Sequence, residues 1–160
     1  MRLVERHIVK DNRFEDICFK SGLLYNYVLY NIRQGIFSGN YLKEFDLSDK
    51  LCKENQFDFR NLPNHVSQQV IKQVFKNIKS WMRLKKDFEK NPSKYGNHRP
   101  HLPSYKKGKK QNMVVFTNCN CRVKGDNCIY FVKDIIKPIK TNVKKDELKQ
   151  VRIIPLLHVM

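Results

Sequence analysis

The longest repeating pattern in the sequence lies at Leu62–Pro92, where apolar and cationic side chains alternate with the period of an α-helix. At about 100° per residue, the apolar side chains fall on one side: Val66, Val70, Val74, Trp81, Leu84 and Phe88, with Ile78 on the flank. The pattern predicts one long helix with Pro63 in its first turn and Asn61 or Asn64 as its cap. We expect the helix to end at Asn91–Pro92 and to be anchored in the core by Trp81 and Phe88.

Cations follow the opposite side of this helix at steps of three and four residues. These six residues, called the basic stripe below, are Lys72, Lys76, Lys79, Arg83, Lys86 and Lys90. At a rise of 1.5 Å per residue the row is roughly 27 Å long. A solvated helix face would explain ordinary surface lysines, but such faces usually mix the two signs of charge. Only Asp87 and Glu89 lie nearby, and the pattern therefore favours binding to a polyanion.

The remainder of the first half of the chain is also predominantly helical in pattern. Residues 14–37 carry an apolar stripe of Ile17, Leu24, Val28 and Ile32 and predict a helix ended by Ser38-Gly39-Asn40. A short helix is expected near residues 47–54. Tyr25, Tyr27 and Tyr30 could stack on bases, but on so apolar a helix they are better interpreted as the edge of the core. Before these helices, residues 2–9 predict a short strand that Asp11-Asn12 ends.

After residue 112 the pattern changes to short β-rich runs separated by turn residues. Strands are predicted at 113–117, 121–124 and 128–132, with Gly125-Asp126-Asn127 as a hairpin turn. Residues 135–139 predict another strand, which Pro138 keeps from a central position. A last strand begins at 151–154, and an apolar ending follows it without a polar cap or turn. We therefore expect a sheet that is incomplete and a chain that is a truncated piece of a longer protein.

A loop rich in proline and lysine connects the helical and β-rich parts at 91–112. Its cations are Arg99, Lys106, Lys107, Lys109 and Lys110, and Tyr95 and Tyr105 are interleaved with them. Cations with interleaved aromatics suit binding to a nucleic-acid backbone. A disordered basic linker would fit the same composition equally well.

Composition supports an electrostatic role for the middle of the chain. The 160 residues carry a net charge of +17 at pH 7, and 41% of them are hydrophobic, enough to form a core. Residues 61–110 hold 13 of the 32 Lys and Arg but only 2 of the 15 Asp and Glu. Such an excess attracts nucleic acid or an anionic membrane surface.

Other features of the whole sequence indicate the cellular compartment. No run of 18 apolar residues is present, and we expect no membrane span. The charged N-terminal residues lack the apolar centre of a signal peptide. An odd number of cysteines without such a signal indicates reduced thiols in a cytosol. These cysteines are Cys18, Cys52, Cys119, Cys121 and Cys128.

Residues that could carry chemistry are few, and we predict neither a catalytic residue nor a metal ligand. Structural zinc usually takes two close pairs of ligands, whereas Cys119, Cys121 and Cys128 provide one pair and a third thiol. Alternation along a strand would place Cys119 and Cys121 on one face as packed thiols. His98 and His101 have metal-like spacing without an evident partner and fit the basic loop better. An autonomous nuclease built from Asp46, Asp49 and Glu54 stays open, although their spacing does not recommend it.

The order of short motifs along the chain resembles the N-terminal part of the TnpB/OrfB proteins of bacterial insertion sequences. The matching motifs are Leu-Val-Glu-Arg-His-Ile-Val at 3–9, Leu-Tyr-Asn at 24–26, Ile-Arg-Gln at 32–34, Leu-Pro at 62–63, Val-Ser at 66–67, Lys-Ser-Trp at 79–81, Asn-Pro-Ser-Lys-Tyr at 91–95, Arg-Pro-His-Leu-Pro-Ser-Tyr-Lys at 99–106, Lys-Pro-Ile-Lys-Thr at 137–141 and Gln-Val-Arg-Ile-Ile-Pro at 150–155. Each motif alone is weak, and their order over nearly the whole chain makes the resemblance specific.

The resemblance implies an α+β fold in which a helical recognition bundle is inserted into a small, incomplete, antiparallel β-barrel. Residues 1–12 would form the first strand of a wedge-like barrel, and 13–91 the helical insert. Residues 92–112 would be the basic loop, and 113–160 the rest of the barrel. In the family a RuvC-like nuclease domain and a four-cysteine zinc finger follow.

The resemblance also implies a function. The family consists of RNA-guided DNA endonucleases, commonly labelled transposases and related to type V CRISPR effectors. The Mg and Zn sites of the family would lie beyond residue 160, and this chain would hold no cofactor of its own. It would bind guide RNA and double-stranded DNA, without a membrane partner, in the bacterial cytoplasm at the nucleoid. Two alternatives are a nuclease or transposase subunit that needs a RuvC-like partner, and a protein that sequesters RNA.

Overall fold

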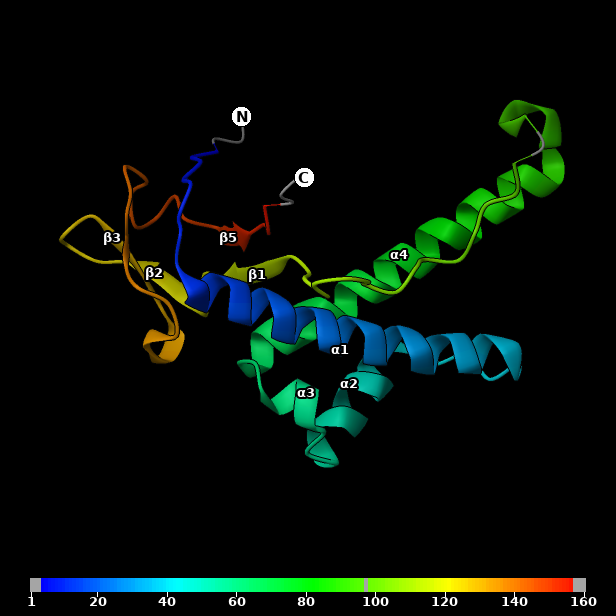
Figure 1. Cartoon of the computed structure of the whole chain (residues 1–160), viewed down its shortest axis with the longest axis horizontal. Coiled ribbons are helices and arrows are strands. Elements are labelled where there is room, and N and C mark those ends of the chain that lie inside the picture. The colour runs from blue at the N-terminus through cyan, green and yellow to red at the C-terminus, as the bar shows by residue number, and fades with distance from the viewer. Residues whose placement is uncertain (1–3, 97, 157–160) are drawn as a thin grey trace.

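Helices precede strands in this chain, and the computed structural model describes residues 4–96 and 98–156 (Figure 1). Within these ranges, four α-helices are followed by five short β-strands in two antiparallel sheets. The predicted α+β class is therefore confirmed.

The first helix, α1, spans Asn12–Phe37. Asp11 caps its N-terminus: the Asp11 carboxylate accepts a hydrogen bond from the Arg13 backbone N–H at 2.9 Å, and this bond satisfies one of the free donors of the first turn. The helix ends at Ser38, and Gly39 follows with a positive φ of 77°. The predicted apolar stripe of α1 is buried, as expected from its helical period.

Two shorter helices, α2 (Glu44–Lys53) and α3 (Phe57–Arg60), connect α1 to α4 (Asn64–Lys90). The predicted short helix begins earlier than expected, and α3 was not predicted. The predicted asparagine cap of α4 is wrong, because Pro63 occupies that position and no side chain caps the helix. The Ser67 hydroxyl instead donates to the Phe59 carbonyl at 2.7 Å and ties α3 to α4. The predicted end at Asn91 is confirmed.

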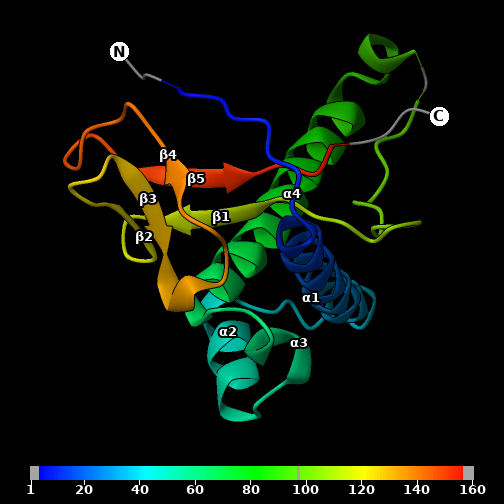
Figure 2. The ribbon, with the colours of Figure 1, turned by 60° about the vertical axis from the view of Figure 1, so that its left-hand side comes forward.

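The strands form two small sheets (Figure 2). In one, β1 (Val114–Thr117) pairs with β5 (Gln150–Ile153). In the other, β3 (Cys128–Phe131) lies between β2 (Cys121–Val123) and β4 (Ile139–Lys140).

The strand predictions are largely confirmed, but the barrel prediction is not. The residue 125–127 turn joins an antiparallel pair. The predicted strand at 135–139 is wrong over residues 135–138, which form no strand; β4 begins only at Ile139, after Pro138, and lies at the edge of its sheet. Within the described residues the two sheets do not close into a barrel. A two-stranded and a three-stranded sheet contain too few strands to close around an interior of side chains.

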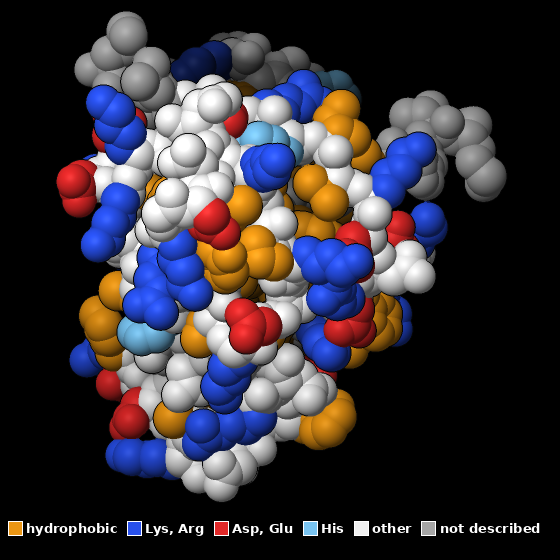
Figure 3. Space-filling model, turned by 90° about the vertical axis from the view of Figure 1, so that its left-hand side faces the viewer, with side chains coloured by type: hydrophobic (Ala, Val, Ile, Leu, Met, Phe, Trp, Pro, Cys, Tyr) orange, Lys and Arg blue, Asp and Glu red, His pale blue; other side chains and the backbone are white. Residues whose placement is uncertain are grey.

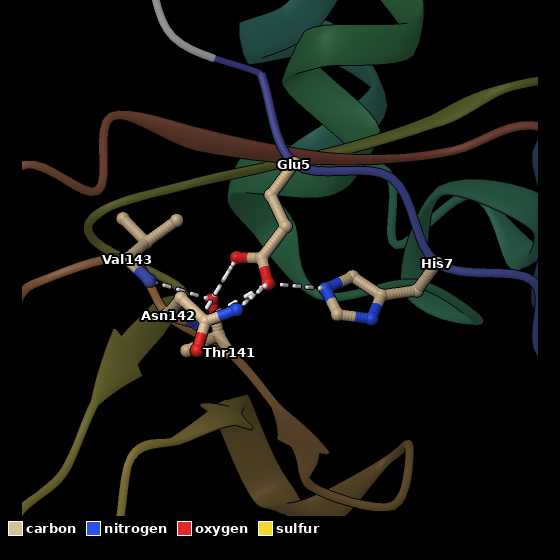
Figure 4. A network of polar contacts seen from close by, with 5 residues as sticks. All are labelled: Glu5, His7, Thr141, Asn142 and Val143. Carbon is tan, nitrogen blue, oxygen red and sulfur yellow. Dashed lines mark hydrogen bonds and ion pairs between the residues drawn. The ribbon is translucent and has the colours of Figure 1, made fainter.

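The predicted first strand at 2–9 is wrong over residues 4–9, which form no strand; its first residues lie outside the described ranges. The side chains of Val4 and Ile8 are 85% and 70% exposed, so the apolar residues of this segment have no sheet face to pack on. The Glu5 side chain fixes the segment instead (Figure 4). Its carboxylate accepts hydrogen bonds from the Thr141 hydroxyl at 2.5 Å and the Asn142 backbone N–H at 3.1 Å.

A continuous core joins the helices to the sheets. The helix α4 contacts α1, α2, α3 and β1, and it is therefore the central element. The rings of Phe116 on β1 and Phe131 on β3 meet edge to face, with centroids 5.0 Å apart, and link the two sheets. None of the described helices has an apolar stretch long enough to cross a bilayer.

Candidate nucleic-acid interface

The basic stripe lies on the solvent side of α4. All six of its cations are exposed, and the buried residues of the helix lie on the opposite side. The sequence pattern therefore predicted the exposed face correctly. Within the described residues, no carboxylate approaches any of the six closely enough to form an ion pair. The stripe consequently presents unneutralised charge to solvent.

The two acids near the stripe are paired with cations that do not belong to it. Glu89 lies 3.8 Å from the ammonium of Lys85. Asp87 lies 2.8 Å from the ammonium of Lys94 and also accepts hydrogen bonds from the Tyr95 hydroxyl and the Asn91 amide. The hydrogen bonds from Lys94, Tyr95 and Asn91 lower the pKa of Asp87 to about 2. These pairs leave the charge of the stripe intact.

The helix α4 is buried along only part of its length. Its buried residues run from Val66 to Ile78, and beyond Ile78 the helix extends away from the rest of the molecule (Figure 1). A short 3-10 helix, η1 (Pro92–Tyr95), follows, and residues 98–105 then return along α4. We call Lys79–Lys90, η1 and this returning segment the projection.

The prediction that Trp81 and Phe88 anchor α4 in the core is wrong. Both side chains are half-buried; Trp81 contacts the returning segment and Phe88 contacts η1. The Trp81 indole N–H donates to the Pro100 carbonyl at 3.2 Å. The Phe88 ring packs edge to face on Tyr95, with centroids 5.9 Å apart. The apolar side chains of α4 thus keep their helical spacing beyond Ile78, but only η1 and the returning segment cover them. Leu84 is 48% exposed.

The loop cations differ from one another. Arg99, Lys107, Lys109 and Lys110 are exposed and available to a ligand. The ammonium of Lys106 instead lies 4.7 Å from the centre of the Tyr25 ring, and burial lowers the pKa of this group. Lys106 therefore belongs to the packing of the loop on α1 more than to its charged surface.

Two contacts fasten the loop to α1. The Asn26 side chain accepts from the Lys106 backbone N–H at 2.7 Å and donates to the Lys106 carbonyl at 3.0 Å. Further along, the Lys110 carbonyl lies so close to Gly22 that a Cβ there would come within 1.5 Å of it. Glycine at this position is what allows the loop to cross the helix.

A buried polar cluster completes the crossing. The Asn112 backbone N–H donates to the Cys18 carbonyl at 3.0 Å, and its side-chain amide donates to Ser21 at 3.1 Å and to Gln73 at 2.9 Å. Asn112 thereby joins α1, α4 and the start of β1. The loop is therefore an ordered segment over this stretch, in contrast to a disordered linker.

The residues considered for catalysis or metal binding are not brought together. The side chain of Asp49 pairs with Lys53 at 2.7 Å, and Glu54 pairs with Lys50 at 3.9 Å. Across residues 4–96 and 98–156, no group of three or more His, Cys, Asp or Glu side chains could hold a metal ion.

The cysteine prediction is correct for only one of two residues. Cys121 is buried, and burial raises the pKa of its thiol to about 11. Cys119 lies in the turn before β2 and is exposed, so the two do not share a strand face. All five cysteines are unpaired.

The far end of the molecule differs electrostatically from α4. In Figure 3, which views the end formed by β2, β3 and β4, Lys and Arg side chains are interspersed with Asp and Glu. The connecting segments there carry exposed carboxylates at Asp126, Asp134, Asp146 and Glu147. This end has the mixed signs of an ordinary solvated surface.

Sequence reasoning missed two features. One is the Glu5 site, where hydrogen bonding from Thr141 lowers the pKa of the carboxyl and His7 lies 3.2 Å away (Figure 4). Its partners are separated by more than 130 residues, and no local pattern signals such a contact. The other is the exposure of Tyr27 and Tyr30, which the sequence placed with Tyr25 at the edge of the core; of the three only Tyr25 is buried.

Comparison of the chain with protein-family models, with curated proteins and with solved structures finds no match. The interface is therefore interpreted from its own geometry and charge.

Proposed function

We propose that this chain binds nucleic acid through the basic stripe of α4 and the exposed cations of the adjoining loop. The observation that carries the proposal is the row of six exposed cations with no carboxylate partner among the described residues. A row of roughly 27 Å is as long as about eight base-pair steps measured along the axis of a duplex.

The chemistry of such binding is the release of condensed counterions. Each phosphate neutralised by a lysine or arginine returns counterions to solution, and affinity therefore falls steeply as salt is added. Because the stripe is not neutralised by its own protein, little intramolecular pairing must be broken before a phosphate is bound.

We further propose that the chain is the nucleic-acid-binding region of a TnpB-like protein of the bacterial cytoplasm. Its partners would be guide RNA and double-stranded DNA. The order of the short motifs supports this assignment, as does the position of the stripe on a helix that precedes a basic loop and short strands. In this proposal the helices are a recognition insert in a barrel-like lobe, and the chain contributes binding rather than cleavage.

The salt dependence of affinity tests the role of the stripe. In a variant with Lys72, Lys76, Lys79 and Arg83 changed to Gln, we expect weaker binding to duplex DNA and to structured RNA. On duplex DNA the slope of log K against log salt should become less steep by up to about 3.6, or 0.9 for each lost contact. Fluorescence anisotropy between low and moderate salt measures both quantities.

A matched control removes the same charge from the opposite end of the molecule. Lys133, Lys137, Lys144 and Lys145 are exposed, and changing them to Gln also lowers the net charge by four. We expect this variant to keep a slope close to that of the unmodified protein. Equal slopes in the two variants would show that net charge alone matters and that the stripe is only a solvated surface.

A further inference from the structure

The outer face of α1 carries exposed aromatic side chains along its length. These residues, called the aromatic stripe below, are Phe19, Tyr27, Tyr30 and Phe37, and they are 41%, 36%, 54% and 68% exposed. At about 100° per residue they lie within a sector of about 80° opposite the buried side of the helix. Such a row is unusual, because large exposed apolar groups that gather on one face commonly mark a binding site.

The basic loop flanks this stripe on one side. Gly22, Asn26 and Arg33 occupy the helix line next to the aromatics, and each is in contact with the loop. The Arg33 guanidinium lies 5.0 Å from the centre of the Tyr105 ring, while Gly22 and Asn26 make the contacts with Lys110 and Lys106 described above. The loop therefore runs along the edge of the stripe.

Charge along this face is predominantly positive beyond the first turns of α1, where Asp16 is paired with Lys20 at 2.6 Å. Residues 98–112 and 17–37 contain no Asp or Glu. Exposed cations of the loop, Lys107, Lys109 and Lys110, follow the edge of the stripe. On the other side, α2 and α3 carry Glu44, Asp46, Asp49 and Asp58 among their charges. A polyanionic backbone would thus be attracted to the loop side of the stripe and not to the other.

A hollow lies at the C-terminal end of the stripe. It has a volume of about 320 Å³ between α1 and α2. The amides and hydroxyl of Asn31, Gln34, Asn40 and Ser38 line it, together with one charged side chain of each sign from α2, Asp46 and Lys50. Gln34 is exposed and falls within the angular sector of the aromatic stripe. Amide side chains are the groups that hydrogen-bond base edges and ribose hydroxyls.

We propose that this face binds an unpaired stretch of RNA. Bases stack on Tyr27, Tyr30 and Phe37, phosphates lie against Lys107, Lys109 and Lys110, and a terminal base enters the hollow beside Gln34. Stacking requires bases that are not paired within a duplex, and the amides supply partners for the ribose 2′-hydroxyl.

This surface is separate from the basic stripe. The two helices pack on each other through their buried sides, and each stripe lies opposite the buried side of its own helix. The aromatic and basic stripes therefore face away from each other. One carries cations without aromatics and suits a duplex backbone, whereas the other combines aromatics with a basic edge.

Binding of a short uridine oligomer to single variants tests the proposal. We expect Tyr30→Ala and Phe37→Ala each to weaken binding about tenfold, because one stacking contact is lost. The salt slope should not change in either. Replacing Lys107, Lys109 and Lys110 with Gln should make the slope less steep by about 0.7 for each contact. The matched controls are Phe45→Ala and Phe57→Ala, whose side chains are 83% and 73% exposed on α2 and α3.

Two further binding measurements test whether the ligand is RNA. A thymidine oligomer of equal length should bind several-fold more weakly than the uridine oligomer, and equal affinity would overturn the assignment to RNA. Gln34→Ala should reduce this preference with little effect on affinity for the thymidine oligomer. Circular dichroism confirms that each variant is folded, which is expected because every changed side chain is on the surface.

Other results would overturn the proposal. Unchanged uridine affinity in Tyr30→Ala and Phe37→Ala would exclude stacking at this face. If these variants instead converted a dimer to a monomer in sedimentation, the face would be an interface between copies of the chain. The outcome is independent of the basic stripe, because the Gln variant of Lys72, Lys76, Lys79 and Arg83 leaves the aromatic stripe intact. Duplex binding therefore tests the basic stripe, and uridine binding tests the aromatic stripe, so either proposal can fail without the other.

Discussion

The two halves of α4 have the same sequence pattern and different surroundings. Over Asn64–Ile78 the apolar side of the helix is buried against α1, β1 and the shorter helices. Over Lys79–Lys90, a length of about 18 Å, the apolar side is covered only by η1 and the returning residues 98–105 (Figure 1). The basic stripe nevertheless continues unbroken along both halves.

The difference shows that the period of a helix specifies which side is buried, but not how far the core extends along it. In the outer half, η1 and the returning segment take the place of the neighbouring helices and sheet. A thin cover of this kind leaves the cations of Arg83, Lys86 and Lys90 accessible from several directions, as a helix that enters a groove of nucleic acid requires.

The largest effect should come from shortening an apolar side chain in the inner half. Ile71 is 1% exposed, and Ile71→Ala should lower the free energy of unfolding by about 2–5 kcal/mol, because it leaves a cavity in the core. The matched change in the outer half, Leu84→Ala, removes a side chain that is 48% exposed. It should cost less than about 1 kcal/mol. Urea denaturation followed by circular dichroism measures both.

Similar losses of unfolding free energy in Ile71→Ala and Leu84→Ala would contradict the difference between the inner and outer halves of α4. They would mean that the outer half is buried in solution, either by a second copy of the chain or by closer packing of the returning segment. Sedimentation of the unmodified protein would distinguish these two explanations.

A second effect should come from the point where the returning segment reaches α1. The Asn26 side chain makes two hydrogen bonds with the Lys106 backbone. Asn26→Ala leaves a partly buried donor and acceptor without these partners and should cost about 1–3 kcal/mol. The control, Asn31→Ala, removes an amide that bonds only within its own helix, to the Tyr27 carbonyl. A larger loss in Asn31→Ala than in Asn26→Ala would show that this contact does not fasten the loop.

The sequence predicted the long helices and most strands because their signals are local. Helical period, the Ser38-Gly39 ending and the hairpin turn before Cys128 each lie within a few residues of the element they specify. The side of α4 that carries the basic stripe followed from the same period. These are the parts of the fold, and of the candidate site, that a single sequence could supply.

What the sequence did not supply depends on contacts between distant segments. The apolar residues Val4, Ile8 and Val9, on either side of charged residues, favoured a strand, but no described strand pairs with residues 4–9. Trp81 has the spacing of a core residue, yet its partner is the carbonyl of Pro100 in the returning segment. The close approach of Lys110 to Gly22 likewise could not be deduced before the loop was placed on α1.

A smaller effect should come from Trp81 itself. Trp81→Phe keeps most of the apolar contact and removes the hydrogen bond to the Pro100 carbonyl. This change should cost about 1 kcal/mol, confined to the projection. Hydrogen exchange should accelerate in residues 98–105 and stay unchanged in β1. Met82→Leu, at a neighbouring side chain that is 37% exposed, is the control. Faster exchange throughout the chain would show that the projection and the core unfold together.

The smallest effect should appear at the tip of the projection as the pH is lowered. Asp87 has a pKa of about 2 in the folded protein, below the value near 3.9 of an unfolded chain. Its contribution to stability is therefore complete above pH 4 and is lost as the pH falls towards 2. Because Asp87 holds Lys94 and Tyr95, we expect the Phe88–Tyr95 contact to open in this range while the core stays folded. Ring-proton chemical shifts of Tyr95 would report the opening, and in Asp87→Asn they should no longer change with pH between 4 and 2. If the Tyr95 shifts of Asp87→Asn still changed over this pH range, another carboxyl would cause the effect. Asp87 would then not be the residue that holds η1 against the end of α4, where the helix has no support from the core.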